Sequence, residues 1–301
     1  MIIDSHLHVW DLDRCTYPWL DEGAAPINRT ITLDDIEPTL VRHAVGGVVL
    51  VQSADDDADT QYLRDVAAEH PLVVGVVAYA PLDDPEALGE RLDDYLGDPV
   101  IVGVRALIHE HPLSWTERPA VDESFRMLAE AGLPLDVPTT SPEGLAPVVG
   151  WLERHPDLRV VIDHLGKPSL GRDPAALDRW RALLAAVAQH PLATAKLSGL
   201  YAGDGPLDSW KLDDVSRVAE TAFDLFGAAR LLAGGDWPIA MLAGGYDRVW
   251  GAISTATDGL STADREAVLG LAAIRAYSLD PQRLAAARDV TSTLTILEET
   301  P

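Results

Sequence analysis

The sequence predicts a (β/α)8 barrel, a TIM-like fold of the α/β class, distorted and extended by C-terminal helices. Eight short apolar runs rich in β-branched residues recur along the chain, and amphipathic helical patterns separate most of them. The 301 residues also suffice for such a barrel, which typically needs about 250. An open, doubly wound sheet is the main alternative. Its usual glycine-rich turn is missing after the first strand, which ends in His6-Leu7-His8 instead.

The elements follow one another in alternation. The expected strands are 2–9, 47–52, 72–79, 100–107, 133–137, 158–164, 194–197 and 230–233. The expected helices between them include 60–69, 124–131, 145–154, 174–189 and 212–226. The long, helix-poor loop 11–32 is expected to cover the barrel mouth. We expect one domain over 1–301, with the barrel in about 1–260 and a helical addition in about 261–301, including helices 262–277 and 282–288.

The composition limits the classes of partner. The chain has 48 acidic and 23 basic residues, a formal net charge of −25. Nucleic acids and anionic membranes are bound through clustered lysine and arginine, so this charge argues against both. Cys15 is the only cysteine, no apolar run approaches the about 18 residues that cross a bilayer, and the N-terminus does not read as a signal peptide. We therefore expect a soluble cytoplasmic protein, monomeric or homo-oligomeric, that acts on a small molecule.

The nine histidines divide by their place relative to the strands. Chemistry in these barrels lies at the carboxyl ends of the strands, and the opposite face serves stability. A histidine that ends a helix just before a strand complements the helix dipole, so we expect a structural role there. The four histidines of this kind are His43, His70, His155 and His190. His109 and His111 follow the fourth strand and are either rim or surface residues; we favour the surface.

His6, His8 and His164 lie at the carboxyl ends of strands. Residues i and i+2 of a strand share a face, so His6 and His8 point into the barrel together. Neutral imidazoles suit a divalent metal, and a charged imidazole polarises a carbonyl group. Asp236 follows an apolar strand and two glycines, where a general base would be needed. Its structural alternative is a helix N-cap or a turn residue.

Other side chains are expected around the same mouth. Asp163, next to His164, should face the opposite way, toward the helices. Arg105 ends the fourth strand, where it either binds a carbonyl or carboxylate oxygen of the substrate or forms a salt bridge at the rim. The remaining residues expected to line a pocket for a small polar ring are Gln52, Trp10, Trp19 and Trp237.

With these residues the chain resembles the amidohydrolase superfamily, in the amidohydrolase-related branch that contains sugar lactonases and 2-pyrone-4,6-dicarboxylate lactonase. The segments that carry the resemblance are Ile-Asp-Ser-His-Leu-His-Val-Trp-Asp at 3–11, Tyr-Pro-Trp at 17–19, Gly-Val-Val-Leu-Val-Gln at 47–52, Gly-Val-Arg at 103–105, Ile-Asp-His-Leu-Gly-Lys-Pro at 162–168, Lys-Leu-Ser-Gly at 196–199 and Gly-Gly-Asp-Trp-Pro at 234–238. The histidine pair alone is a weak motif, but the complete set in this order is specific. The resemblance implies that His6, His8, His164 and Asp236 face the substrate, that Asp236 activates water, and that Lys167 contacts the substrate.

Two departures from the family pattern bear on the chemistry. Many metal-dependent members carry a histidine on the fifth strand, whereas 133–137 reads Leu-Pro-Leu-Asp-Val. We therefore expect at most one weakly bound divalent ion, zinc before other metals. The candidate ligands of this ion are His6, His8, Asp236 and His164. A metal-free enzyme is the alternative. Gly235 stands where the family usually has serine, which removes a hydroxyl near Asp236.

The hypothesis with most support is a hydrolase that opens a small lactone ring, above all a sugar (aldono) lactone. Asp236 would take a proton from the attacking water, and His6, His8 or Arg105 would stabilise the developing oxyanion. His164 would orient either the carbonyl group or the water. A zinc-dependent amidohydrolase or decarboxylase of the same superfamily is the second hypothesis, and a non-catalytic carbohydrate-binding barrel is the third.

Overall fold

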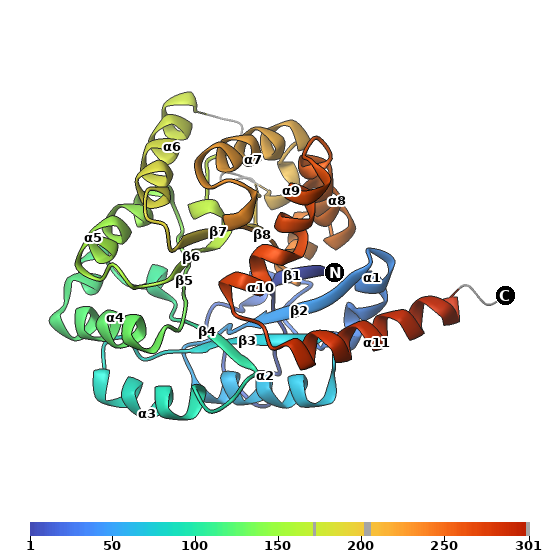
Figure 1. The fold of residues 1–301 in the computed structure, drawn as a ribbon, viewed down its shortest axis with the longest axis horizontal. Coiled ribbons are helices and arrows are strands. Elements are labelled where there is room, and N and C mark those ends of the chain that lie inside the picture. The colour runs from blue at the N-terminus through green and yellow to red at the C-terminus, as the bar shows by residue number, and fades with distance from the viewer. Residues whose placement is uncertain (171–172, 202–205, 299–301) are drawn as a thin grey trace.

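Eight parallel strands form the frame of the molecule, in a computed structural model that describes residues 1–170, 173–201 and 206–298. They hydrogen-bond in the order of the sequence, each to the next, and helices surround the ring of strands (Figure 1). The strands are β1 (Ile2–Leu7), β2 (Val45–Val51), β3 (Val73–Tyr79), β4 (Ile101–Arg105), β5 (Leu135–Val137), β6 (Val160–Ile162), β7 (Ala193–Leu197) and β8 (Leu231–Ala233). All eight expected strands are present, most of them a few residues shorter than the apolar runs. The predicted barrel is confirmed.

The barrel is distorted where the first and last strands meet. In the described chain β1 and β8 share no continuous ladder; Leu7 forms a single parallel bridge with Trp237, beyond the end of β8. Two backbone hydrogen bonds accompany it, from Asp236 N to His6 O (2.8 Å) and from His8 N to Trp237 O (2.7 Å). We call this contact the seam. It closes the barrel at its carboxyl-terminal end, beside residues expected to form the site.

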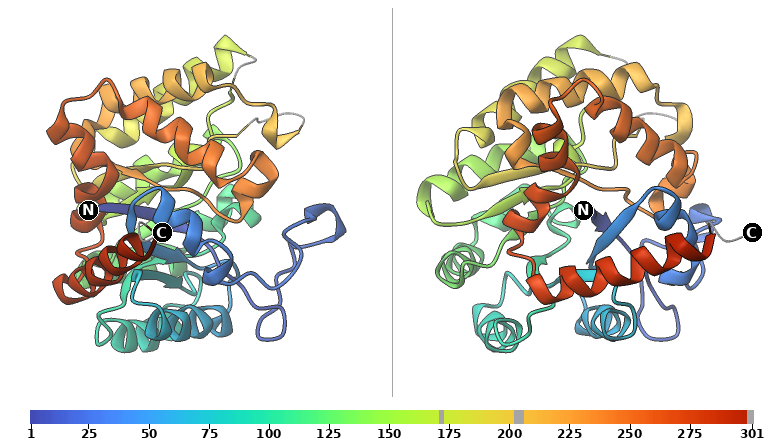
Figure 2. Two further views of the ribbon diagram at one scale, coloured as in Figure 1. Left: turned by 90° about the vertical axis from the view of Figure 1, so that its right-hand side faces the viewer. Right: turned by 45° about the vertical axis from the view of Figure 1, so that its right-hand side comes forward.

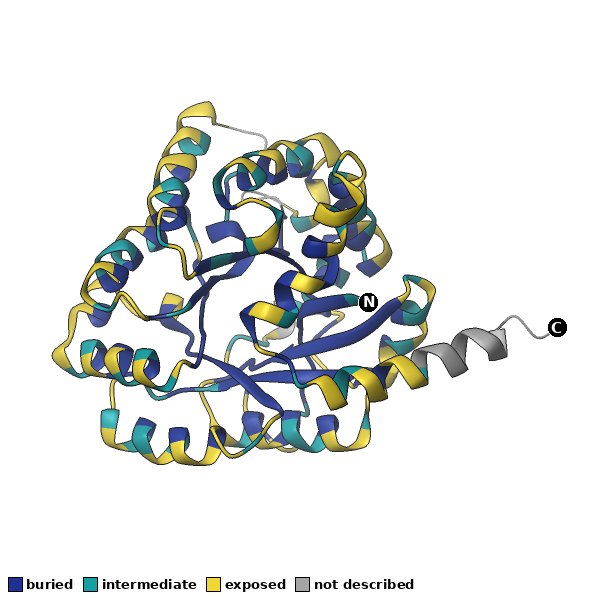
Figure 3. Cartoon of the chain, viewed as in Figure 1, coloured by how far each residue is buried: buried dark blue, intermediate teal, exposed yellow. Residues whose placement is uncertain are grey.

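The helices cover the outside of the strands and turn their polar faces to solvent (Figure 3). They are α1 (Glu37–Arg42), α2 (Asp57–Glu69), α3 (Pro85–Tyr95), α4 (Pro119–Ala131), α5 (Ala146–Arg154), α6 (Pro174–Ala188), α7 (Leu212–Phe226), α8 (Tyr246–Thr257), α9 (Thr262–Glu266), α10 (Ala272–Ala276) and α11 (Pro281–Glu298). Side chains of Asp56, Asp84 and Asp173 cap α2, α3 and α6 by accepting backbone N–H bonds. His70 and His155 follow the last residues of α2 and α5, as expected.

The segment after α8 closes the barrel where the strands begin. A π-helical turn, Ala267–Leu271, joins α9 to α10, so the helix expected at 262–277 is present with an irregular middle. Gly270 lies so close to the chain start that a Cβ atom there would be 2.1 Å from the Met1 carbonyl oxygen, and this approach requires glycine. Tyr277 and Leu279 join a buried apolar cluster with Val49, Val102 and other strand residues.

The loop 11–32 lies at the opposite end and projects from the barrel (Figure 2, left, in blue). Trp10 anchors its base: the indole donates a hydrogen bond to the Arg29 carbonyl oxygen, and the backbone of Trp10 pairs with that of Ile31. The Trp19 ring packs edge-on against Trp10, with ring centres 5.2 Å apart. Within the described residues, no helix combines the length and apolar character needed to cross a membrane.

Candidate active site

A cavity of about 240 Å³ opens at the carboxyl ends of the strands. Six of the ten residues expected from the sequence to form the site line it: His8, His164, Asp236, Arg105, Lys167 and Trp19. His109 lines it too, and its side chain is exposed, so it lies at the rim where the cavity meets the surface. His111 does lie at the surface, with its ring stacked on Trp115 (centres 4.4 Å apart).

Asp236 lies directly on the seam. The glycines before it let the chain leave β8, and Asp236 itself adopts the left-handed conformation (φ 51°), which aspartate tolerates better than most residues. Its carboxylate is 2% exposed, and burial raises its pKa from 3.8 to about 7. Lys167 and the buried hydroxyl of Tyr201 act in the opposite direction, because both stabilise the charged carboxylate. An aspartate with a pKa near neutrality suits a general base.

The three predicted histidines meet around Asp236. The ring centres of His6 and His8 are 4.8 Å apart, and those of His6 and His164 are 4.6 Å apart. Burial lowers the pKa of all three imidazoles, that of His6 to about 3, so the rings are neutral at neutral pH. The Nδ1 atom of His164 lies 2.9 Å from the Ser198 hydroxyl, which fixes its ring plane.

A chain of hydrogen bonds determines where His6 and His8 carry their protons. Lys196 Nζ lies 2.9 Å from His6 Nδ1 and can only donate, so His6 carries its proton on Nε2. That nitrogen is 3.0 Å from His8 Nε2, which accepts. His8 then carries its proton on Nδ1 and donates it to the Val51 carbonyl oxygen (2.7 Å). His6 is fully buried behind His8 and is not among the residues that line the cavity, contrary to the expectation that it faces the substrate.

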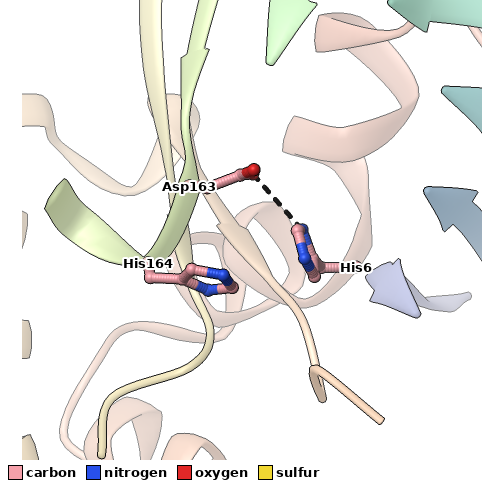
Figure 4. A group of neighbouring side chains, drawn as sticks. All are labelled: His6, Asp163 and His164. Atoms are coloured by element: carbon pink, nitrogen blue, oxygen red, sulfur yellow. Dashed lines mark ion pairs between the residues drawn. The ribbon is translucent and has the colours of Figure 1, made fainter. Parts of the chain in front are cut away.

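Asp163 points into the site, so the prediction that it faces the helices is wrong. In strand β6, Val161 belongs to the apolar cluster inside the barrel and Ile162 to the core under the helices, so the alternation of the strand carries Asp163 inward. Left-handed conformations at His164 and Leu165 (φ 54° and 52°) then interrupt the alternation and bring His164 into the site as well. Asp163 Oδ1 lies 3.3 Å from His6 Nδ1, and Figure 4 shows this carboxylate, His6 and His164 gathered together. Burial alone would raise the pKa of Asp163, but Lys196, His6 and Arg105 hold it well below its usual range.

A buried network of charges lies behind the histidines and was not predicted. Lys196 forms ion pairs with Asp136 Oδ2 (2.5 Å) and Asp163 Oδ1 (3.1 Å), and all three side chains are fully buried. The Tyr277 hydroxyl donates to Asp136 from the C-terminal segment. Asp136 therefore lies on the fifth strand, where the family resemblance implies that a metal-binding histidine is missing, and holds an ammonium group in place. The sequence contained a signal for this network: Lys196 and Asp136 are single charged residues within apolar strands, and buried charges need partners of opposite sign.

Asp4 joins the two sides of the seam. It accepts hydrogen bonds from His6 N (3.0 Å), from Gly235 N (2.9 Å) and from the Tyr246 hydroxyl (2.8 Å). A Cβ atom at Gly235 would lie 2.2 Å from the Tyr246 ring and 2.7 Å from Asp4 Oδ2. The ring of Tyr246 thus fills the space that a serine side chain at position 235 would need, and its hydroxyl donates a hydrogen bond to Asp4.

Arg105, which lines the cavity, and the remaining expected residues, which do not, are held by contacts within the protein. Arg105 forms the salt bridge rather than a free substrate contact: Nη1 lies 3.1 Å from Asp163 Oδ2, and Nη2 donates to the Gln52 carbonyl oxygen. The Gln52 amide donates to Asp55 and to the Arg105 carbonyl oxygen. Trp10 and Trp237 are buried in the apolar core, so their expected contact with a ligand ring is wrong.

His6, His8 and Asp236 are arranged as ligands of one divalent ion. Their nitrogens are 3.6 and 3.8 Å from Asp236 Oδ1 and 3.0 Å from each other, close to the about 3.3 Å between ligands of a tetrahedral zinc ion. His8 presents a free lone pair, as a ligand must. His6 presents its proton as long as Lys196 donates to Nδ1, and it becomes a ligand only when that proton moves to Nδ1, beside Asp163. The residues fit an ion, and the competition with Lys196 makes it a weakly held one.

Comparison with known proteins agrees with this geometry. Residues 3–279 match the family described as Amidohydrolase. The chain is 32% identical over 289 residues to an L-fucono-1,5-lactonase of Burkholderia multivorans, covering 92% of this chain and 96% of that one. It is also 32% identical to an L-fucono-1,5-lactonase of Burkholderia ambifaria, over 81% of this chain and 82% of the relative.

The fold also has a counterpart among solved structures. A crystal structure of an amidohydrolase from Burkholderia multivorans with bound zinc superimposes with a TM-score of 0.86, at 29% identity, over 93% of this chain and 100% of that one. The family match covers nearly the whole barrel, and the resemblance predicted from the sequence is confirmed. The chain belongs to the amidohydrolase family.

Proposed function

We propose that this protein hydrolyses a sugar lactone to the corresponding aldonic acid. The observation that carries the proposal is Asp236, a buried carboxylate with a pKa of about 7 at the edge of a polar cavity, beside three neutral imidazoles. Two relatives named L-fucono-1,5-lactonase, each 32% identical over at least four fifths of this chain, support the choice of a lactone. A 1,5-lactone of a six-carbon sugar is the substrate class that we favour.

Asp236 acts as the general base. Its ionised carboxylate takes a proton from a water molecule as that water attacks the lactone carbonyl carbon. In the seam, the backbone N–H of Asp236 donates a hydrogen bond to the backbone carbonyl oxygen of His6, and this bond holds the base at a fixed distance from the histidines. Ring opening then breaks the bond between the carbonyl carbon and the ring oxygen, and the proton held by Asp236 passes to that oxygen.

Lys167 and His164 are the groups that stabilise the oxyanion. Both line the cavity, and among the described residues no carboxylate forms an ion pair with Lys167. Arg105 is committed to Asp163 and Gln52, so it acts by its charge and by holding Asp163 in place. A zinc ion held by His6, His8 and Asp236 would add positive charge at the carbonyl oxygen.

The proposal is tested by acid release from a panel of sugar 1,5-lactones, followed with a pH indicator and corrected for spontaneous hydrolysis. We expect turnover of at least one lactone by the wild-type protein and none above background by Asp236→Asn. If no lactone of the panel is opened, or if the variant is as active as the wild type, the proposed function is wrong.

A further inference from the structure

A second cavity, of about 530 Å³, continues from the catalytic one. It lies over the loops that follow β5, β6 and β7, and the two cavities share Thr139, His109 and Lys167. The catalytic cavity alone, at about 240 Å³, is smaller than the about 300–1,000 Å³ of typical ligand sites. The lactone ring proposed above needs only the first cavity, so the second one has no role in that reaction.

The lining of the second cavity suits hydroxyl groups. The polar side chains that line it are those of His109, Thr139, Thr140, Ser141, Lys167, Ser169 and Tyr201. The Thr139 hydroxyl is buried and has no hydrogen-bond partner in the described chain, and the Tyr201 hydroxyl, whose proton is directed to the Asp236 carboxylate, receives no hydrogen bond itself. A buried polar group without a partner is rare, because it loses its bonds to water and gains nothing in return. A ligand hydroxyl in this cavity can supply the missing partner.

The charge around the cavity favours a neutral ligand over an acidic one. Lys167 lines both cavities and, among the described residues, forms no ion pair with a carboxylate. An anionic substituent in the second cavity would pair with Lys167 and weaken its attraction for the oxyanion that develops in the first. A neutral, hydroxyl-rich group makes the hydrogen bonds and keeps the charge of Lys167 available to the reaction.

We infer that the second cavity is a subsite for a sugar ring attached to the lactone, so that the preferred substrate is a glycosylated aldonolactone rather than a monosaccharide lactone. The inference rests on the proposed lactonase function for the lactone ring in the first cavity, and on the second cavity for the attached sugar ring. The attached ring contacts the hydroxyl groups of the second cavity, and Lys167 lies between the two rings.

The test compares matched substrates. Glucono-1,5-lactone is assayed beside three forms of it that carry a second sugar: maltobiono-, cellobiono- and lactobiono-1,5-lactone. Two additional hydrogen bonds, each contributing about 1 kcal/mol, predict an about 30-fold higher kcat/KM for at least one disaccharide lactone, mostly through a lower KM. If all three are hydrolysed no faster than the monosaccharide lactone, the inference is wrong.

Ser169→Trp fills the second cavity without touching the first, because Ser169 lines only the second. We expect it to abolish the advantage of the disaccharide lactone and to leave turnover of glucono-1,5-lactone near the wild-type level. Ser114→Trp, the same change at an exposed serine away from both cavities, is the control and should leave both substrates unaffected. Equal effects of the two variants would overturn the subsite.

Equilibrium binding separates the subsite from the proposed function. Titration calorimetry with the product acids, gluconate against maltobionate, cellobionate and lactobionate, needs no turnover. If no lactone is hydrolysed but a disaccharide acid binds about tenfold more tightly than gluconate, and Ser169→Trp removes the difference, the lactonase proposal fails and the subsite stands. If the acids bind equally, the subsite fails whatever the activity.

Discussion

The ammonium group of Lys196 lies 2.9 Å from Nδ1 of His6, and between the carboxylates of Asp136 and Asp163. This position makes Lys196 a donor to the imidazole, and it places the proton of His6 on the nitrogen that faces His8. Lys196 lines neither the catalytic cavity nor the second one and acts through His6, as a positioning residue. Through the Tyr277 hydroxyl on Asp136, the same network reaches the helices that close the far end of the barrel.

Replacement of Lys196 tests this role. We expect Lys196→Met to destabilise the fold by about 3–5 kcal/mol, because two buried carboxylates lose their partner. In the folded fraction the proton of His6 should move to Nδ1, where Asp163 accepts it. Thermal denaturation measures the first effect, and long-range ¹H–¹⁵N spectra of histidine-labelled protein measure the second. The wild-type spectrum is itself decisive: a His6 protonated on Nδ1 would contradict the assignment, whether or not the variant folds.

Asp236→Asn is expected to lower kcat by about 10²–10⁴-fold, because an amide matches the carboxylate in shape but cannot take a proton from water. At pH 8 the same variant should be more stable than the wild type, by about 2–4 kcal/mol at most, since burial penalises only the charged carboxylate. Activity and chemical denaturation are measured on the same preparations. His190→Ala, at a helix end remote from the cavity, is the control: it should keep full turnover and lose no more than about 0.3–1 kcal/mol.

The pH profile should rise through about pH 7 as Asp236 ionises. No falling limb from the imidazoles is expected between pH 5 and 9, because burial keeps His6, His8 and His164 neutral there. Lys167→Met should move the midpoint to higher pH, since Lys167 favours the ionised carboxylate. The profile of kcat/KM in a pH-stat is the measurement. A midpoint near 4 would show that Asp236 is not the group that titrates.

The ionisation of Asp236 also makes stability depend on pH. Its pKa is higher in the folded state (about 7) than in an unfolded chain (3.8), so the folded protein binds the proton more tightly. The contribution of Asp236 to stability is therefore complete below about pH 4 and is lost as the pH rises to about 7. Asp236→Asn should remove this component of the curve, which is measured by denaturant unfolding at each pH.

Removal of metal should leave part of the activity. Lys196 competes for the lone pair that His6 would offer to an ion, and the fifth strand carries Asp136 in place of a histidine. We expect substoichiometric zinc in purified protein and measurable turnover after prolonged chelation. Elemental analysis, followed by assay of chelated and zinc-reconstituted samples, gives the result. Complete loss on chelation with complete recovery on zinc addition would assign an essential metal instead.

Gly235→Ser restores the usual family residue and should destabilise this protein by about 1–3 kcal/mol, because a Cβ atom there lies 2.2 Å from the Tyr246 ring. Tyr246→Leu removes that ring and the hydroxyl that Asp4 accepts. In the double variant the ring no longer blocks the Cβ atom, and a small shift of the Asp4 carboxylate, 2.7 Å from that atom, lets the serine hydroxyl donate to it, so stability should recover in part. A double-mutant cycle from thermal unfolding measures the coupling. Additive effects would show that Tyr246 does not substitute for the serine.

The barrel was predictable because each strand is an apolar run, and periodicity in the sequence reports burial directly. His8, His164 and Asp236 were predictable because their place at strand ends determines where they lie. Asp163 was not, because the inward face of β6 was assigned to His164. Asp163 continues the inward face of Val161, and a left-handed turn, which has no fixed sequence signature, brings His164 to the same side. The pairing of Lys196 with Asp136 joins strands 60 positions apart, and no local pattern indicates which buried charges meet.

The seam has a consequence for how the protein loses activity on warming. The two backbone bonds that hold β1 against the end of β8 are made by His6, His8, Asp236 and Trp237. The proposed catalytic groups therefore lie where neighbouring strands of the described barrel share the fewest backbone bonds. We expect local opening there to separate Asp236 from the histidines before the rest of the molecule unfolds. Loss of activity on warming should thus precede global unfolding and reverse on cooling. An enzymatic assay would then detect local opening of the seam at temperatures where bulk spectroscopy still reports a folded protein.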